Sequence, residues 1–191
     1  MIQRDESGSK STETATIAGG CFWCIEAVFE RIEGVEKVVS GYTAGHVDDP
    51  TYEQVCTGLT GHTEAVQVTY SPDTISYRDV LKFFFAFHDP TTLNRQGPDV
   101  GTQYRSGVYY DSPEQKEECE AVIADLTVDG VWKDPIVTEV AALSPFFPAE
   151  EYHQQYYQRN PTAPYCRVII DPKVLKLREA YSSTLKPAPS V

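Results

Sequence analysis

Two cysteines near the N-terminus are the residues best suited to chemistry. Cys21 and Cys24 stand in Gly20-Cys21-Phe22-Trp23-Cys24, a spacing that brings two thiols within reach of a disulfide on a helix. Cys21 follows two glycines and precedes apolar residues at helical spacing. The free N–H groups and positive end of a helix N-terminus stabilise a thiolate, the nucleophilic form of cysteine. The sequence therefore predicts a thiol at Cys21 that is activated by its position alone. The alternative is a small packed cysteine at a helix start.

Two further side chains could complete a site around this thiol. Trp23 lies on the polar side of the predicted helix with Glu26 and Glu30, and an exposed ring beside a nucleophile can form one wall of an apolar pocket. Glu64 alternates onto the face of Val66 in a strand-like segment. If that face is buried, desolvation raises the pKa of Glu64 and leaves a carboxylic acid that can donate a proton. The alternatives are a Trp23 packed beneath a loop and a Glu64 that faces water.

The other cysteines and the histidines carry weaker signals. Cys56, Cys119 and Cys166 bring the total to five, an odd number that favours redox chemistry over structural disulfides in a chain of 191 residues. A zinc site needs four ligands with paired spacing, and a second pair to match the first is missing from the sequence. We therefore expect no metal and no cofactor. His153 stands in a tyrosine-rich stretch and could orient a pocket group.

The elements that must position these residues alternate between strands and helices. Hydrophobic periodicity and turn residues predict strands over 14–18, 35–42, 63–70, 104–110 and 136–140. Helices are predicted over 22–33, between Ser76 and His88, from Ser112-Pro113 onward, and near 150–158. This order indicates an α+β fold: a ferredoxin-like split βαβ core with a mixed sheet. The long loops 46–61 and 91–103 are of a length that tends to be functional, and the C-terminal segment is expected to be irregular.

Length and charge limit the organisation and the partners. One domain over 14–181 is expected between flexible tails at 1–13 and 182–191. The net charge of −12, with no basic stripe, argues against nucleic acid and against an anionic membrane surface. A run long enough to span a membrane is missing, and the polar N-terminus does not resemble a secretory signal. The sequence therefore predicts a cytoplasmic protein, expected to be a monomer.

Five segments follow one another along the chain: Gly20-Cys21-Phe22-Trp23, Gly61-His62-Thr63-Glu64, His88–Gly97, Gly101–Ser106 and Tyr152–Tyr156. In this order they resemble the peptide methionine sulfoxide reductases of the A type, which act on methionine-S-sulfoxide. The resemblance extends over about residues 14–175, nearly the whole predicted domain. It implies thiol-dependent reduction of methionine-S-sulfoxide, free or in proteins, as repair after oxidation.

The resemblance also implies roles for individual residues. Cys21 would attack the sulfoxide sulfur, while Glu64 would protonate the oxygen, helped by hydrogen bonds from Tyr52 and Tyr104. Methionine would leave, Cys21 would become a sulfenic acid, and a second cysteine would condense with it to a disulfide that thioredoxin reduces. The residues that would contact the substrate are Phe22, Trp23 and Asp99.

Departures from the family pattern leave one choice open. Cys24 stands where many members have glycine, so it could resolve the sulfenic acid as in other Cys-x-x-Cys motifs. Cys166 matches a region where many members place a resolving cysteine, and a flexible C-terminal segment could carry it to Cys21, which slightly favours Cys166. Pro98 replaces a frequent asparagine before Asp99 and could reshape the pocket rim.

Two other functions compete with this interpretation. A general thiol–disulfide oxidoreductase would use Cys21 and Cys24 but would give Glu64 and Tyr104 no task. A peptide-binding module that recognises methionine segments without turnover would not need the Cys21 thiol.

Overall fold

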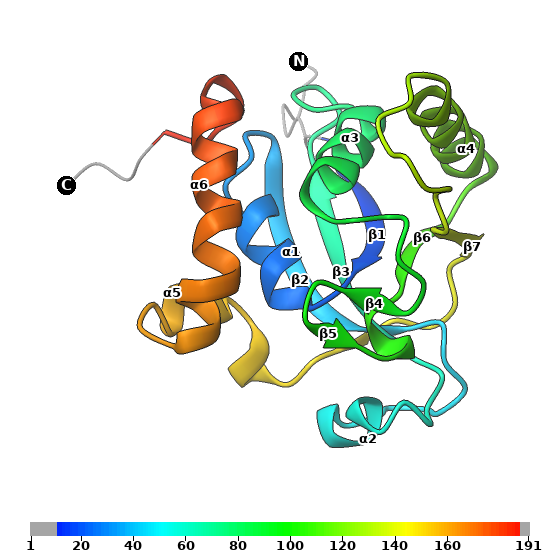
Figure 1. The fold of residues 1–191 in the computed structure, drawn as a ribbon, viewed down its shortest axis with the longest axis vertical. Coiled ribbons are helices and arrows are strands. Elements are labelled where there is room, and N and C mark those ends of the chain that lie inside the picture. The colour runs from blue at the N-terminus through cyan, green and yellow to red at the C-terminus, as the bar shows by residue number, and fades with distance from the viewer. Residues whose placement is uncertain (1–10, 188–191) are drawn as a thin grey trace, which may run out of the picture.

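A six-stranded mixed sheet organises the fold in a computed structural model that describes residues 11–187 (Figure 1). The strand order is β7-β6-β1-β3-β2-β8, and neighbours are antiparallel except for the parallel pair β6 and β7. The strands are β1 (Glu13–Gly19), β2 (Val35–Thr43), β3 (Thr63–Tyr70), β6 (Ser106–Tyr110), β7 (Glu139–Ala142) and β8 (Phe147–Pro148).

Helical crossovers connect these strands as the sequence predicted. Helix α1 (Phe22–Phe29) connects β1 to β2, and α3 (Tyr77–Phe87) connects β3 to β6. Because β3 pairs with both β1 and β2, it is inserted between two parallel strands, which confirms the split βαβ plan. Helix α4 (Pro113–Val128) leads from β6 to the parallel edge strand β7.

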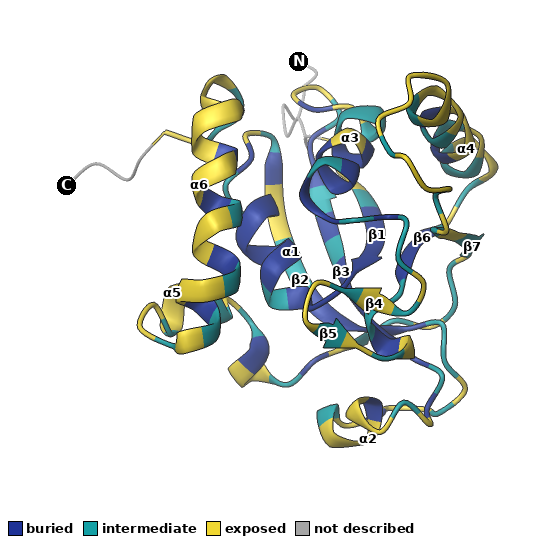
Figure 2. Ribbon diagram, in the orientation of Figure 1, coloured by how far each residue is buried: buried dark blue, intermediate teal, exposed yellow. Residues whose placement is uncertain are grey.

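The local sequence signals explain where these elements begin and end. Ser76 and Ser112 each accept a hydrogen bond from a backbone N–H three residues later, which caps α3 and α4. The predicted strand over 63–70 matches β3 residue for residue. The predicted helix over 22–33 ends at Phe29, and Gly34 then turns the chain at a φ of +88°. The core lies between the sheet and helices α1 and α3, whose inner faces are buried (Figure 2).

Both long loops contain structure that the sequence analysis missed. Helix α2 (Tyr52–Cys56) lies in the first, where Thr51 and Gln54 form a capping box. The hairpin β4 (Arg95–Gln96) and β5 (Asp99–Val100) lies in the second, followed by a 3₁₀ turn over Thr102–Tyr104. The strands predicted over 104–110 and 136–140 are consequently displaced to β6 and β7.

The C-terminal part is more regular than predicted. After α5 (Tyr156–Arg159), a π-helical stretch over Cys166–Ile170 runs directly into α6 (Asp171–Ala180). Helix α6 packs on α1 and buries Val174 and Leu177, so the expectation of an irregular segment was wrong here.

The predicted tails overlap only partly with the described residues. Within the predicted tail 182–191, Leu185 forms a β-bridge with Ile32, and the Lys186 N–H donates to the Arg31 carbonyl at 2.9 Å. Residues 1–10 and 188–191 lie outside the described part, and the single-domain boundary at 14–181 stays a prediction. Among the residues described, none of the helices is long and apolar enough to cross a membrane.

Candidate active site

Cys21 occupies the junction between β1 and α1, as its position after two glycines predicted. It is the N-cap residue of α1, and its side chain is only 7% exposed. Gly20 precedes it at a φ of +91°, and a Cβ atom built there would lie 2.5 Å from the Cβ of Gln96. Only glycine fits this approach, so the turn that presents Cys21 depends on the contact between the β1 end and the β4–β5 hairpin.

The ionisation of Cys21 differs from the sequence prediction. Burial raises the pKa of its thiol well above the usual cysteine value, and the charge of Glu64 adds to this effect. Desolvation of the thiolate therefore outweighs the favourable helix N-terminus. The prediction of a thiol activated by the helix start alone is wrong, because that position is closed to solvent. The resting sulfur keeps its proton at neutral pH.

Glu64 lies beside this thiol with its carboxyl group buried. It comes from β3, is 1% exposed, and accepts the Phe22 backbone N–H on Oε2 at 3.0 Å. Burial raises the pKa of Glu64 to about 8, and the charge of Asp99 contributes to the rise. The inward position predicted for Glu64 is confirmed, and its raised pKa favours the carboxylic acid at neutral pH. The carboxyl group contacts the backbone of Phe22, the residue that follows Cys21.

Aromatic side chains surround the pair. The Phe22 ring lies 6.2 Å from the Trp23 ring and 6.5 Å from the Tyr52 ring, measured between centroids. Burial raises the pKa values of Tyr52 and Tyr104, and the charge of Glu64 adds to both. Helix α2 supplies Tyr52 and the turn after β5 supplies Tyr104, so the two long loops deliver the two tyrosine hydroxyls to the neighbourhood of Glu64.

Trp23 is covered on its outer side. Its ring stacks on Tyr156 with a centroid distance of 3.7 Å and an angle of 7°, and its indole N–H donates to His153 Nδ1 at 3.2 Å. The polar face of α1 is therefore a contact surface for the C-terminal segment rather than a solvent-facing one. His153, which is 1% exposed, holds the edge of the Trp23 ring.

Asp99 reaches the site through a residue that the sequence analysis did not single out. The Tyr165 hydroxyl donates to Asp99 Oδ2 at 2.8 Å and lies 3.7 Å from the Cys24 sulfur. Burial raises the pKa of Tyr165, so its hydroxyl stays protonated between these two groups. Its neighbour in the sequence, Cys166, was the only clue to its position.

Cys24 interacts with both of the other candidate thiols. Its backbone N–H donates to the Cys21 carbonyl at 3.0 Å, and hydrogen bonding with the Cys21 sulfur lowers the pKa of Cys24. The charge of Lys173, which lines a small cavity with Cys24, lowers it further. Burial raises the pKa of Cys166, and a negative charge on Cys24 raises it more. Each outer thiol therefore interacts with the middle one.

Cys166 does not sit on a flexible segment. It is fully buried and begins the π-helical stretch that continues into α6. The loose segment expected from the sequence is thus packed and helical in this structure, and the movement of Cys166 toward Cys21 stays a prediction. Lys173, from the same C-terminal unit, donates to the Phe87 carbonyl at 2.6 Å and was not identified from the sequence.

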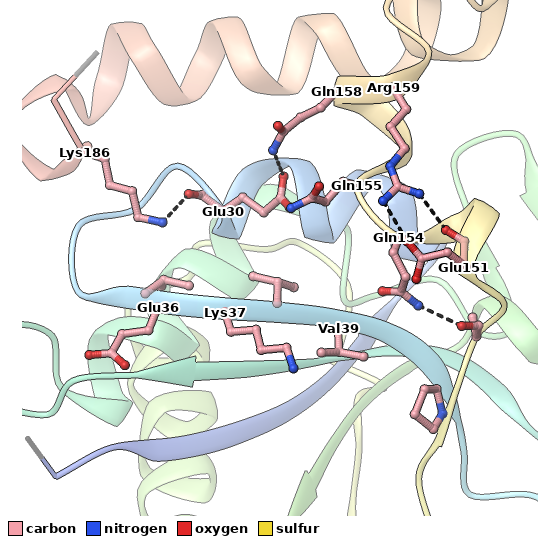
Figure 3. A pocket seen from close by; sticks show the side chains of 14 residues that line it. Glu30, Glu36, Lys37, Val39, Glu151, Gln154, Gln155, Gln158, Arg159 and Lys186 are labelled. Atoms are coloured by element: carbon pink, nitrogen blue, oxygen red, sulfur yellow. Dashed lines mark hydrogen bonds and ion pairs between the residues drawn. The ribbon is translucent and has the colours of Figure 1, made fainter. Parts of the chain in front are cut away.

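A polar groove of ≈590 Å³ lies apart from these residues (Figure 3). It runs along β2 between the end of α1 and the segment over 148–159, and its lining includes none of Cys21, Glu64 and Trp23. The candidate active site is accordingly the buried cluster at the start of α1.

Comparisons with known proteins all lead to the same family. The model for the family described as peptide methionine sulfoxide reductase matches residues 13–185. A protein of Natronomonas pharaonis named peptide methionine sulfoxide reductase MsrA is 54% identical over 171 residues, 90% of this chain and 96% of that one. The crystal structure of Mxr1 from Saccharomyces cerevisiae in reduced form is similar with a TM-score of 0.75 at 36% identity, covering 83% of this chain and 91% of that chain. Mxr1 in complex with Trx2 gives a TM-score of 0.53 at 26% identity, over 81% and 89% of the chains.

Proposed function

The chain belongs to the peptide methionine sulfoxide reductase family, and we propose that it reduces methionine sulfoxide with Cys21 as the nucleophile and Glu64 as the proton donor. One contact carries the assignment of these roles. The 3.0 Å hydrogen bond from the Phe22 N–H to Glu64 fixes a neutral carboxyl group next to the cysteine, across 42 positions of sequence. Membership of the family favours this function over a general disulfide oxidoreductase or a non-catalytic binding module.

The first step transfers oxygen from the substrate to Cys21. The Cys21 sulfur attacks the sulfoxide sulfur while Glu64 gives its proton to the sulfoxide oxygen. The thiol proton of Cys21 then restores the Glu64 carboxylic acid. The hydroxyl group passes from the substrate sulfur to the Cys21 sulfur, which breaks both the substrate S–O bond and the S–S bond formed in the attack. The products are methionine and a Cys21 sulfenic acid, so the sulfoxide is reduced by two electrons and the cysteine is oxidised by two. The Tyr52 and Tyr104 hydroxyls assist by hydrogen bonding to the oxygen.

The substrate pocket is assigned to the aromatic residues around the pair. Phe22 and Trp23 would contact the S-methyl group, because both follow Cys21 directly in the chain and their rings lie 6.2 Å apart. Asp99 would act through Tyr165, because its carboxylate accepts a hydrogen bond from the Tyr165 hydroxyl. The preference for the S epimer rests on the resemblance to the family.

Resolution of the sulfenic acid is assigned first to Cys24. Its backbone N–H donates to the Cys21 carbonyl at 3.0 Å, so the two thiols lie within one turn of α1, and the charge of Lys173 favours the Cys24 thiolate. Condensation forms the Cys21–Cys24 disulfide and releases water. Attack by Cys166 on Cys24 would then give a Cys24–Cys166 disulfide and free Cys21. The similarity to Mxr1, which is known in complex with Trx2, supports a thioredoxin dithiol as the final reductant.

Disulfide mapping tests this sequence of steps. The enzyme would be mixed with one equivalent of methionine S-sulfoxide without reductant, quenched with acid after short and long times, and mapped by mass spectrometry. A Cys21–Cys24 link at short times, followed by Cys24–Cys166, is expected. A direct Cys21–Cys166 link at short times would return the resolving role to Cys166. Methionine formation without loss of the Cys21 thiol would refute the mechanism. The R epimer serves as the stereochemical control.

The cellular location and the oligomeric state are inferred from the sequence alone. A cytoplasmic monomer that binds neither nucleic acid nor membranes stays a prediction.

A further inference from the structure

Glu26 is a buried carboxyl group that the reaction does not use. It lies one helical turn after Trp23 on the same face of α1 and is 1% exposed. Its Oε1 atom accepts the backbone N–H of Gln155 at 2.9 Å, and its Oε2 atom accepts that of Tyr156 at 3.3 Å. A carboxylate on the first helix therefore binds the backbone of a segment 130 positions away.

The segment that Glu26 binds lacks a local cap for its helix. Gln155 adopts a left-handed backbone conformation with φ of +54°, and it is the N-cap residue of α5 without a side-chain cap. The first N–H groups of a helix lack partners within the helix, so Glu26 supplies the cap from α1. A non-glycine residue in this conformation persists only when its surroundings fix it.

A second clamp holds the residue before it. The side-chain amide of Gln154 accepts the Ser40 N–H at 3.0 Å and donates to the Ser40 carbonyl at 2.9 Å. Gln154 thus occupies the edge of β2 as a neighbouring strand would, and it also donates to the Ala149 carbonyl (Figure 3). Because the β2 edge fixes Gln154, the two hydrogen bonds of Glu26 set the direction in which the chain leaves it.

The clamped segment presents its aromatic residues to Trp23. Tyr156, whose N–H is bound by Glu26, stacks on the indole ring at 3.7 Å, and His153 accepts the indole N–H at 3.2 Å. The His153 ring also lies 5.2 Å from the Phe22 ring. His153 and Tyr156 therefore contact the two rings that are assigned to the substrate methyl group. None of the contacts of Glu26 reaches Cys21 or Glu64.

We infer that Glu26 is a positioning residue for substrate binding: its carboxylate fixes Gln155 and Tyr156, and Tyr156 fixes the Trp23 ring that binds the methyl group. The inference rests on the proposed function, because it assumes that Trp23 lines the substrate pocket. Since Glu26 supports the pocket wall and not the reacting pair, its loss weakens binding and leaves the chemical step intact.

Three variants separate this role from general stability. Glu26→Leu removes both acceptor atoms at similar volume, and Glu26→Gln keeps one acceptor. Glu30→Leu is the matched control, since Glu30 lies one turn further, as the C-cap residue of α1, and accepts from the exposed side chain of Gln158 at 2.7 Å. Single-turnover methionine formation is measured against sulfoxide concentration. Trp23 emission is recorded in a Trp132→Phe background, where Trp23 is the remaining one of the two tryptophans.

The expected result is a split between binding and chemistry. Glu26→Leu raises the half-saturating sulfoxide concentration on the order of tenfold, keeps the saturating rate within about twofold, and shifts Trp23 emission to longer wavelength. Glu26→Gln restores most of the binding, and Glu30→Leu behaves as the wild type. Should Glu26→Leu fail to fold, Tyr156→Leu must give the same loss of binding, because it removes the group that Glu26 positions.

Other outcomes overturn the inference. Unchanged half-saturation in Glu26→Leu or in Tyr156→Leu would show that the clamp does not set the pocket. A fall of the saturating rate without a change in half-saturation would place Glu26 with the reacting pair. Failure of the proposed function is seen separately: Cys21→Ser would then still form methionine, whatever the Glu26 variants do.

Discussion

Replacement of Glu64 by glutamine removes the acidic O–H group but keeps the length of the side chain and one carbonyl oxygen. The amide oxygen can still accept the Phe22 N–H that now binds Glu64 Oε2 at 3.0 Å, so the side chain keeps its place. The amide nitrogen then faces the pocket in place of the acid O–H group. A glutamine can donate a hydrogen bond to the sulfoxide oxygen, but it cannot transfer a proton to it. Glu64→Ala removes both abilities.

The size and pH dependence of the effect follow from the buried carboxyl group. General acid catalysis contributes about 10²- to 10⁴-fold, so Glu64→Ala should lose roughly that factor and Glu64→Gln about tenfold less. With a pKa of about 8, Glu64 is about nine-tenths protonated at pH 7 and about one-tenth protonated at pH 9. The reactive form of the enzyme carries a proton on the Cys21 thiol and another on the Glu64 carboxyl group. The wild-type rate should therefore fall about tenfold between pH 7 and pH 9 as Glu64 loses its proton. The glutamine variant has no such group and should stay flat.

A single-turnover assay measures this step without the reductant. Enzyme in excess is mixed with methionine S-sulfoxide from pH 6 to 9, and methionine is quantified in acid-quenched samples. A Glu64→Gln rate close to that of the wild type would refute the role of Glu64 as acid. A wild-type rate that rises toward pH 9 would show that Cys21 must lose its proton before it reacts. That result would contradict a reactive form in which Cys21 and Glu64 are both protonated.

Further predictions concern the other thiols, the nearby cation and stability. Cys24→Ser should form one methionine per enzyme and then stop, whereas normal multiple turnover with thioredoxin would contradict its role. Cys166→Ser should still form the Cys21–Cys24 disulfide but recycle more slowly, as seen by comparing disulfide maps with steady-state rates. Lys173→Met should slow disulfide formation several-fold, on the order expected for a raised Cys24 pKa, without changing methionine release. Lys176→Met is its control, since Lys176 also donates to a helix carbonyl, that of Ala86 at 2.7 Å, and an equal effect would remove the electrostatic explanation. Because burial raises the Glu64 pKa to about 8 from 4.5, the folded state binds more protons than the unfolded state in that range. The contribution of Glu64 to stability should therefore fall as pH rises from about 5 to 8, by roughly 5 kcal/mol at most, and urea unfolding of Glu64→Gln should show a smaller decline than that of the wild type. The decline that remains comes from Glu26, because burial raises its pKa to about 7.

The parts of the fold that were predictable from the sequence depend on local pattern. Alternation over Thr63–Tyr70 defined β3, and serine caps defined the starts of α3 and α4, because these signals involve neighbours in the chain. The order of strands and helices then limited the topology to a split βαβ plan. Helix α6 was missed because its burial depends on packing against α1 rather than on a strong periodicity of its own.

The sequence identified the residues of the candidate site but not the surroundings of their side chains. The sequence placed Cys21 at a helix start, yet the pKa of its thiol depends on closure of the pocket by residues far away in the chain. Trp23 was expected to be exposed, because the residues near it in the sequence give no sign that the distant Tyr156 ring covers it. The Tyr165–Asp99 contact joins positions 66 apart and changes how Asp99 acts. Such contacts are set by tertiary packing and leave no periodic signal.

The role of Cys21 as the oxygen acceptor is tested most directly in a Cys24→Ser, Cys166→Ser variant given one equivalent of methionine S-sulfoxide. With both candidate resolving thiols removed, the variant should release one methionine and keep the oxidised sulfur at Cys21, where a sulfenic-acid reagent traps it for mass spectrometry. Methionine released while Cys21 remains a free thiol would contradict the account.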